Sequence, residues 1–323
     1  MNGCQSKRIK ANAFVLYLRM DNKPHSPNRW LLALGFSVVA AVSYSTATAG
    51  TPVAPKNPAA DPFDWKENTI SPVTNPIYFE DPVIRSEIRP IFIYHNFDSQ
   101  FVTGRGSARV GAIQFRYAIT DRLAFIATQD GYLNINGTGV KGSGWMDLAA
   151  GFKYALINDV QNQFILTPGF TFQLPTGDNK VFNGRGSGQF NPFISFAKGF
   201  GDLHITGNIG ALIPMLRAEQ NTMAHYSLMV DYYVSKWFIP FATANFWTTL
   251  NNASNIPGLR SNGYDVINFG AGNASGVTQG MLGIGFRSRI QKNVDVGFAY
   301  EMAVVKPYGL SNNRFTMDMS FRF

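Results

Sequence analysis

The sequence predicts an all-β fold, a single antiparallel transmembrane β-barrel of about 12 strands with short periplasmic turns and longer extracellular loops. Three observations favour this fold. An export-type leader lies near the N-terminus, the later segments alternate apolar with polar residues, and the connections between them are alternately short and long. Composition agrees, because only 15% of the residues are charged while 14% are aromatic, which suits a surface in contact with lipid.

Residues 1–49 have the features of a signal peptide. The apolar run 30–42 follows basic residues and precedes the small-residue triplet Ala47-Thr48-Ala49. This run is too short to span a membrane, which takes about 20 apolar residues in a helix. We therefore expect cleavage after residue 49, with Met20 as a possible true start; the alternative is an uncleaved membrane anchor.

Removal of the leader would change the charge and the cysteine content of the chain. The leader holds six of the 28 basic residues and one of the 20 acidic residues, so the net charge falls from +8 to about +3. Such a weak positive charge gives no support to nucleic-acid binding. Cys4, the only cysteine, also lies in the leader, so no disulfide or cysteine metal site is expected in the remainder.

Alternation predicts the strands and their facing. Each expected strand is near or above the roughly 9–11 residues that a tilted strand needs to cross a bilayer. In 144–157, Met146, Leu148 and Phe152 share the apolar face opposite Asp147 and Lys153, whereas 122–134 and 237–250 alternate poorly and no facing is assigned there. A soluble β-sandwich would also alternate, but it rarely places charges mid-strand opposite a Phe-rich face. The expected strands are 86–97, 107–120, 122–134, 144–157, 163–175, 189–199, 202–214, 224–234, 237–250, 279–290, 293–304 and 313–323.

The last strand resembles the closing strand of bacterial outer-membrane barrels. Its apolar residues occupy every second position and end on Phe323, while charged and polar residues fill the positions between them. The resemblance implies that Phe323 is recognised by the barrel-assembly machinery and that the chain resides in the outer membrane of a bacterial cell. We accordingly expect outer-membrane lipid around the barrel and residues 84–323 as its extent.

Residues 50–83 precede the first strand and are rich in proline. Two interpretations remain open for this segment, a periplasmic tail, which we favour, and a plug inside the lumen. The aromatic clusters at 62–65 and 77–79 would anchor it in either case.

Charged side chains on the inward face are the candidate lumen-lining residues. Their two signs are nearly balanced, which argues against strong ion selectivity. They either form a salt-bridge network that fills a narrow barrel or line a narrow passage. The residues are Arg89, Arg116, Asp147, Lys153, Asp231, Arg287, Arg289, Asp295, Glu301, Arg314, Asp318 and Arg322.

Enzymatic activity, cofactors and metals are not expected. His225 and Ser227 have the spacing of the catalytic pair of outer-membrane phospholipase A, but Leu228 and Met229 follow where that family has Asn-Gly. The histidines of the barrel lack the spacing of metal ligands. The repeated run Gly-Arg-Gly-Ser at 104–107 and 184–187 is typical of flexible loops, with contact to anionic lipid headgroups as the alternative.

Leu174, Pro175, Thr176 and Gly177 close a Phe-rich strand, and a polar-Pro step follows at Asn191-Pro192. This pattern resembles the outer-membrane transporter-like proteins encoded beside meta-pathway phenol-degradation genes, which are distantly similar to long-chain fatty-acid transporters. The resemblance implies passive uptake of small solutes, often aromatic or hydrophobic, and carries no residue-level substrate site. The alternatives are a sealed structural barrel that binds lipid or a partner and, third, a phospholipase-type hydrolase.

Overall fold

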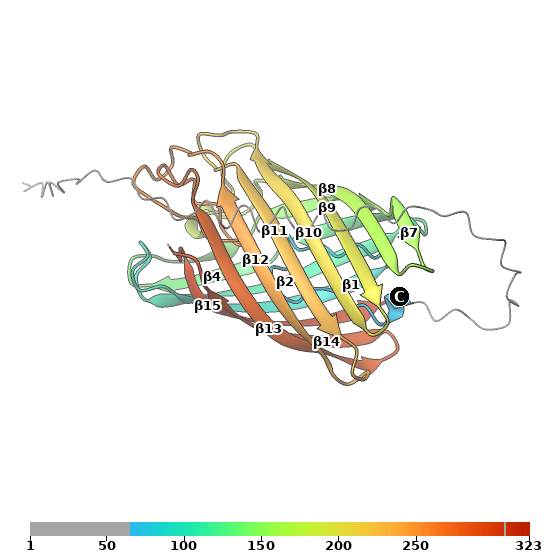
Figure 1. Ribbon diagram of the computed structural model, residues 1–323. Helices are drawn as coiled ribbons and strands as arrows, with labels where there is room; N and C mark the ends of the chain where they lie inside the picture. The colour runs from blue at the N-terminus through green and yellow to red at the C-terminus, as the bar shows by residue number, and fades with distance from the viewer. Residues whose placement is uncertain (1–64, 307) are drawn as a thin grey trace, which may run out of the picture. The chain divides into compact units, whose positions relative to one another are not determined.

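The computed structural model describes residues 65–306 and 308–323, which form one antiparallel β-sheet closed into a barrel (Figure 1). The predicted leader, Cys4 and residues 50–64 lie outside the described residues. The strands are β1 (Glu87–Phe97), β2 (Gly106–Ala118), β3 (Leu123–Gln129), β4 (Tyr132–Gly137), β5 (Lys141–Trp145), β6 (Leu148–Tyr154), β7 (Ile157–Asp159), β8 (Phe164–Leu174), β9 (Gln189–Phe200), β10 (Leu203–Pro214), β11 (Met223–Tyr232), β12 (Ile239–Thr249), β13 (Thr278–Gln291), β14 (Val294–Ala303) and β15 (Ser311–Arg322).

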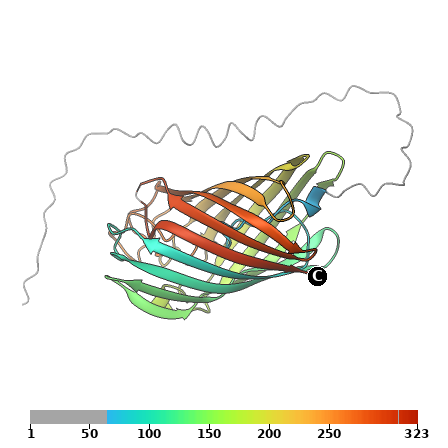
Figure 2. The ribbon, with the colours of Figure 1, turned by 90° about the horizontal axis from the view of Figure 1, so that it is seen from below.

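The first strand closes the barrel by pairing with both of its neighbours. Glu87 of β1 lies opposite Arg322 of β15 on one side and opposite Arg116 of β2 on the other. Figure 2 shows the red C-terminal strands lying beside the blue-green first strands. Strands β3 and β4 are two parts of one wall strand, and β5, β6 and β7 are parts of another, so 12 strands make the wall. The predicted fold class is confirmed.

The two divided wall strands explain where alternation fails. Before the break, Ala124 and Ile126 face inward, but after it Leu133 and Ile135 do, so the inward face moves by one residue. The neighbouring strand makes the same shift at Met146 and Asp147, both of which are buried. The expectation that Met146 shares the lipid face of Leu148 is therefore wrong, because the break turns Met146 inward.

The outer surface carries the large exposed apolar side chains. Phe92, Phe152, Phe170, Ile284 and Phe315 are each exposed by at least two fifths, although they occupy strand positions. In a soluble protein such side chains would be buried, whereas in a membrane barrel they meet lipid. Two short 3₁₀ helices, η2 (Trp65–Glu67) and η3 (Asn179–Val181), complete the described structure, and no helix within it is long and apolar enough to span a membrane.

The interior of the barrel is filled by protein from two directions. Residues 68–83, which precede β1, are buried throughout and are bonded to inward side chains of the wall. The long connection between β12 and β13 contributes Tyr264, Val266 and Phe269 to the same interior, in one hydrophobic cluster with Ile77 and Tyr78. This filling explains why 237–250 alternated poorly, since its inward residues Ile239, Phe241 and Trp247 pack against protein and are apolar.

Candidate functional site

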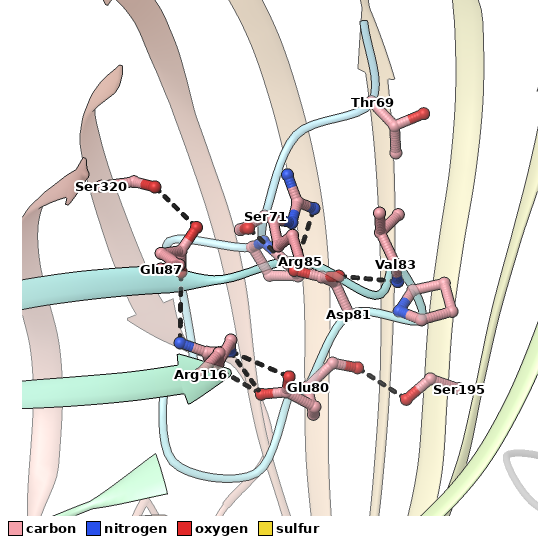
Figure 3. A network of polar contacts seen from close by, with 12 residues as sticks. Thr69, Ser71, Glu80, Asp81, Val83, Arg85, Glu87, Arg116, Ser195 and Ser320 are labelled. Atoms are coloured by element: carbon pink, nitrogen blue, oxygen red, sulfur yellow. Dashed lines mark hydrogen bonds and ion pairs between the residues drawn. The ribbon is translucent and has the colours of Figure 1, made fainter. Parts of the chain in front are cut away.

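The segment before β1, residues 65–86, makes a loop inside the barrel, and we call it the luminal segment (Figure 3). It begins near the short-turn rim, where the ring of Trp65 lies 6.1 Å from that of His204 at the start of β10. It turns at Asn75, whose carbonyl accepts the N–H groups of Tyr78 and Phe79 at 3.3 and 2.8 Å. It then returns to Ser86, next to Glu87 at the end of β1 on the short-turn rim.

Proline and inward polar side chains allow this irregular backbone to be buried. Proline has no N–H group, so it leaves fewer donors that need a partner. The carbonyl of Pro82 accepts the hydroxyl of Thr167 at 2.7 Å, and that of Pro76 accepts Gln114 Nε2 at 2.7 Å. The segment is therefore held by side chains of the wall and does not add a strand to the sheet.

An ion-pair network anchors the returning half of the luminal segment (Figure 3). Glu80 accepts Arg116 of β2 at 2.7 Å and Lys153 of β6 at 2.6 Å. Burial alone would raise the pKa of Glu80, but the charges of Arg116 and Lys153 outweigh that effect and hold its pKa below the ordinary value. Glu80 is thus an anion that two wall strands hold in place.

Asp81 extends the same network. Its carboxylate lies 3.2 Å from Arg85 and 3.7 Å from Lys153, and it accepts the hydroxyl of Ser71 at 2.8 Å. The neighbouring Glu87 accepts Arg116 at 3.2 Å and Ser320 of β15 at 2.6 Å. Charge-assisted hydrogen bonds of this kind are stronger than neutral ones, so the network fixes the segment against β1, β2 and β15.

A second network on the last strands holds the entering half. Asp318 of β15 pairs with Arg89 and, at 2.9 Å, with Arg287 of β13. The same two arginines also donate to the luminal segment, Arg89 to the carbonyl of Pro72 and Arg287 to that of Ser71, the latter at 3.0 Å. These arginines therefore bind a wall carboxylate and the luminal backbone together.

A third network ties the long β12–β13 connection to the wall. Arg314 of β15 pairs with Glu301 of β14 at 2.6 Å and with Asp265 of the connection at 2.5 Å. Tyr264 packs edge-to-face on Trp247 with ring centroids 5.3 Å apart. The connection is thereby fixed inside the long-loop rim, above the tip of the luminal segment.

The inward side chains of β8–β11 include many amides and hydroxyls, and Asp231 is the acid among them. Asn75 donates to Ser227 at 3.0 Å, Ser195 donates to the carbonyl of Glu80 at 2.6 Å, and the ring of Tyr78 stacks on His225. A space of about 10 Å³, enough for one water, remains between Tyr78 and Gln189. Gln189 is buried, and its amide atoms have no partner among the described residues.

The predicted lumen residues fall into groups. Arg89, Arg116, Lys153, Arg287 and Arg314 are buried on the inward face and bind the luminal segment or the β12–β13 connection. Their wall partners Glu301 and Asp318 belong to the same networks.

The remaining predicted residues lie elsewhere. Asp231 binds His204 at 2.8 Å, away from the three networks. Arg289 and Arg322 both pair with Asp295, at 3.1 and 3.0 Å, near the turn between β13 and β14. These last three form a cluster beside the short-turn rim, where Arg289 also donates to the carbonyl of Glu67 at the start of the luminal segment.

Asp147 has a different environment from the other predicted residues. It lies at the break between β5 and β6, where its carboxylate accepts the N–H groups of Gly177 and Gly184 at 2.8 and 2.7 Å and Gln173 Nε2 at 2.7 Å. The Thr176 hydroxyl accepts the N–H of Leu148 at 3.1 Å. The run Leu174 to Gly177 therefore caps the broken wall strand.

His225 and Ser227 bind different groups. His225 Nε2 lies 2.8 Å from Asn191, while Ser227 accepts Asn75. A nucleophile and its base must hydrogen-bond to each other. In the described structure His225 and Ser227 instead bind Asn191 and Asn75, respectively.

Sequence reasoning missed Glu80 and Asp81 as site residues. Both lie in the Pro-rich segment, whose place inside the barrel is not encoded in any strand pattern. The available signal was their isolation, because residues 68–79 carry no charge and these two acids follow directly. A second signal was the need of the buried cations on the wall for anionic partners, because the acids on the strands do not supply a partner for each of them.

No model of a known protein family matches the chain, and no curated protein matches it. Among solved structures, an outer membrane channel from Pseudomonas putida F1 is 13% identical, with a TM-score of 0.53 over 74% of this chain and 96% of that one. The NanC porin aligns over 74% of this chain and 100% of its own at 10% identity, with a TM-score of 0.48. The KdgM porin aligns over 73% and 99% at 8% identity, with a TM-score of 0.44.

The first of these likenesses identifies the class of fold. The chain is a closed antiparallel barrel of the outer-membrane channel type. The comparisons do not identify the phenol-degradation-associated family, which stays a prediction from residues 174–177.

Proposed function

We propose that the protein is an outer-membrane channel for the passive uptake of small solutes, whose lumen is occupied in this structure by residues 65–86. The observation that carries the proposal is the polar attachment of that segment. Glu80 and Asp81 meet the wall through ion pairs with Arg116 and Lys153. Charged groups on both sides can be rehydrated when water enters a barrel, whereas an apolar core cannot.

The size of the barrel supports small solutes. About eight strands give an interior that side chains fill, and about 16 give a wide aqueous channel. A 12-stranded wall lies between these limits. Aromatic or hydrophobic compounds are the solutes that the resemblance at residues 174–177 favours, and we include them in the proposal on that ground.

A sealed structural barrel is the second candidate. It is favoured by the filling of the interior, where the luminal segment and the β12–β13 connection share one hydrophobic cluster. The two candidates differ in one respect, which is whether residues 65–86 can leave the lumen. A phospholipase-type hydrolase has no such support, because His225 and Ser227 bind different partners.

Neutralising Glu80 and Asp81, the two acids that anchor the luminal segment, tests the channel directly. Glu80→Gln with Asp81→Asn removes the attraction to Arg116 and Lys153, so we expect larger and more frequent openings than in the wild type in planar bilayers. Asp121→Asn with Asp159→Asn changes two residues near the short-turn rim and serves as the matched control. If the anchor variant assembles normally and conducts no more than the control, the sealed barrel is the better account.

Assembly would involve outer-membrane lipid and the barrel-assembly machinery. Phe323 is 65% exposed and directly follows β15, the strand that closes the barrel. We expect deletion of Phe323 to reduce the heat-modifiable, membrane-inserted fraction in cells, while Phe323→Tyr retains it. Equal insertion of the deletion variant and the wild type would show that this residue is not a recognition element.

A further inference from the structure

A cavity of about 620 Å³ opens on the outer face of the barrel where two wall strands break side by side. Strand β2 pairs with β3 from Phe115 to Ala118 and with β4 from Gly106 to Gly111. Between these ladders two side chains bridge the gap: Asp130 accepts the N–H of Ile113 at 2.9 Å, and Gln114 Nε2 donates to the carbonyl of Thr128 at 2.5 Å. The regular ladder is thus interrupted at this point of the wall.

Gly131 maintains the break. Its φ of +109° is one that side-chain-bearing residues rarely adopt, and a Cβ there would lie 2.5 Å from the carbonyl oxygen of Gly111. Its own carbonyl accepts the N–H of Met146 at 2.8 Å, which links the break in β3–β4 to the break in β5–β6. The cavity is therefore a built feature of two strands together.

The lining of the cavity is mostly apolar. Ile113, Tyr132, Trp145 and Leu148 are exposed by 58, 44, 65 and 50% around it. The rings of Tyr132 and Trp145 meet edge-to-face with centroids 5.5 Å apart. Such a lining fits a hydrocarbon chain or ring supplied from the surrounding lipid.

Asp130 gives the cavity one charged group. One carboxylate oxygen accepts the N–H of Ile113, and no cation of the described residues forms an ion pair with this carboxylate. A carboxylate in an apolar setting is costly unless a donor or a cation reaches it. An acyl chain of the bulk lipid has no hydrogen-bond donor to offer the Asp130 carboxylate.

We propose that this cavity binds an amphiphile from the membrane, a molecule with an apolar body and one hydrogen-bond-donating head group that reaches Asp130. The site lies in the wall, so its occupation does not depend on whether the lumen conducts. Trp145 at the cavity provides an optical reporter, since Trp65 and Trp247 are buried inside the barrel.

The test is quenching of Trp145 fluorescence by 12-bromododecan-1-ol in vesicles that hold the Trp237→Phe protein. We expect quenching that saturates with the mole fraction of the alcohol, and at least a tenfold weaker response to the corresponding methyl ether, which lacks the donor. Gly111→Leu should abolish saturation, because a Cβ at Gly111 meets no atom within 4 Å and the side chain would fill the cavity without a clash.

Ala242→Leu on β12 is the matched control, an outward position on a strand that does not line the cavity. Quenching that rises linearly and is unchanged by Gly111→Leu would show ordinary lipid contact and overturn the proposal. Equal response to the alcohol and the ether would also overturn it, because the head group would then play no part.

Discussion

At the scale of single residues, buried arginine and lysine side chains of the wall bind the segments that fill the barrel. Arg116 and Lys153 share Glu80, while Arg287 divides its guanidinium between Asp318 and the carbonyl of Ser71. Removing one partner from such a set leaves an uncompensated charge, which costs several kcal/mol where water is excluded and much less where water enters. The effect of each substitution therefore depends on whether the lumen is closed or hydrated.

A glycine at the wall break supplies the sharpest prediction at this scale. A Cβ at Gly177 would lie 2.6 Å from Asn183 Cβ and 2.7 Å from the carbonyl oxygen of Trp145, so Gly177→Ala must displace the cap around Asp147. We expect a loss of about 1–3 kcal/mol in the free energy of unfolding, measured by urea titration in vesicles. Gly258→Ala is the control, since a Cβ there meets no atom within 4 Å. Equal stability of the two variants would contradict the role given to residues 174–177.

At the scale of the element, a strand in this wall is defined by which face meets lipid, and a one-residue shift reverses that face. Strand β6 lies after the break, with Phe152 exposed and Lys153 buried. Regular alternation made most of the strands predictable, and the residues at 122–134 and Met146 were missed because the breaks reverse the facing midway. No local pattern marks the point of reversal except Gly131.

Facing in β6 can be tested at Phe152. Phe152→Arg places a charge on the lipid side, and we expect a loss of about 2–4 kcal/mol if the residue lies near the bilayer midplane. Phe152→Leu keeps an apolar side chain and should cost far less, which makes it the control. The measurement is urea unfolding in bilayers. A similar cost for Arg and Leu would mean that this side of β6 does not meet lipid.

At the scale of the whole molecule, the barrel is closed from both rims. The luminal segment rises from the short-turn rim, and the β12–β13 connection descends from the long-loop rim to meet it around Tyr78 and Phe269. The sequence predicted the barrel and the inward cations, but Glu80, Asp81 and Asp265, which bind those cations, lie outside the strands. Their positions follow from contacts between residues distant in the sequence, such as Asp265 with Arg314. The alternation of apolar and polar residues along a strand does not predict such contacts.

The central claim is that residues 65–86 occupy the lumen and that their departure opens a passage. The most direct measurement is the conductance of Asn75→Cys, Ser227→Cys in planar bilayers, because these two side chains are in hydrogen-bond contact across the lumen at 3.0 Å. With the single-cysteine variants as controls, we predict that the oxidised double variant remains closed and that a reductant restores openings of wild-type size. Openings that persist unchanged in the cross-linked protein would contradict the account.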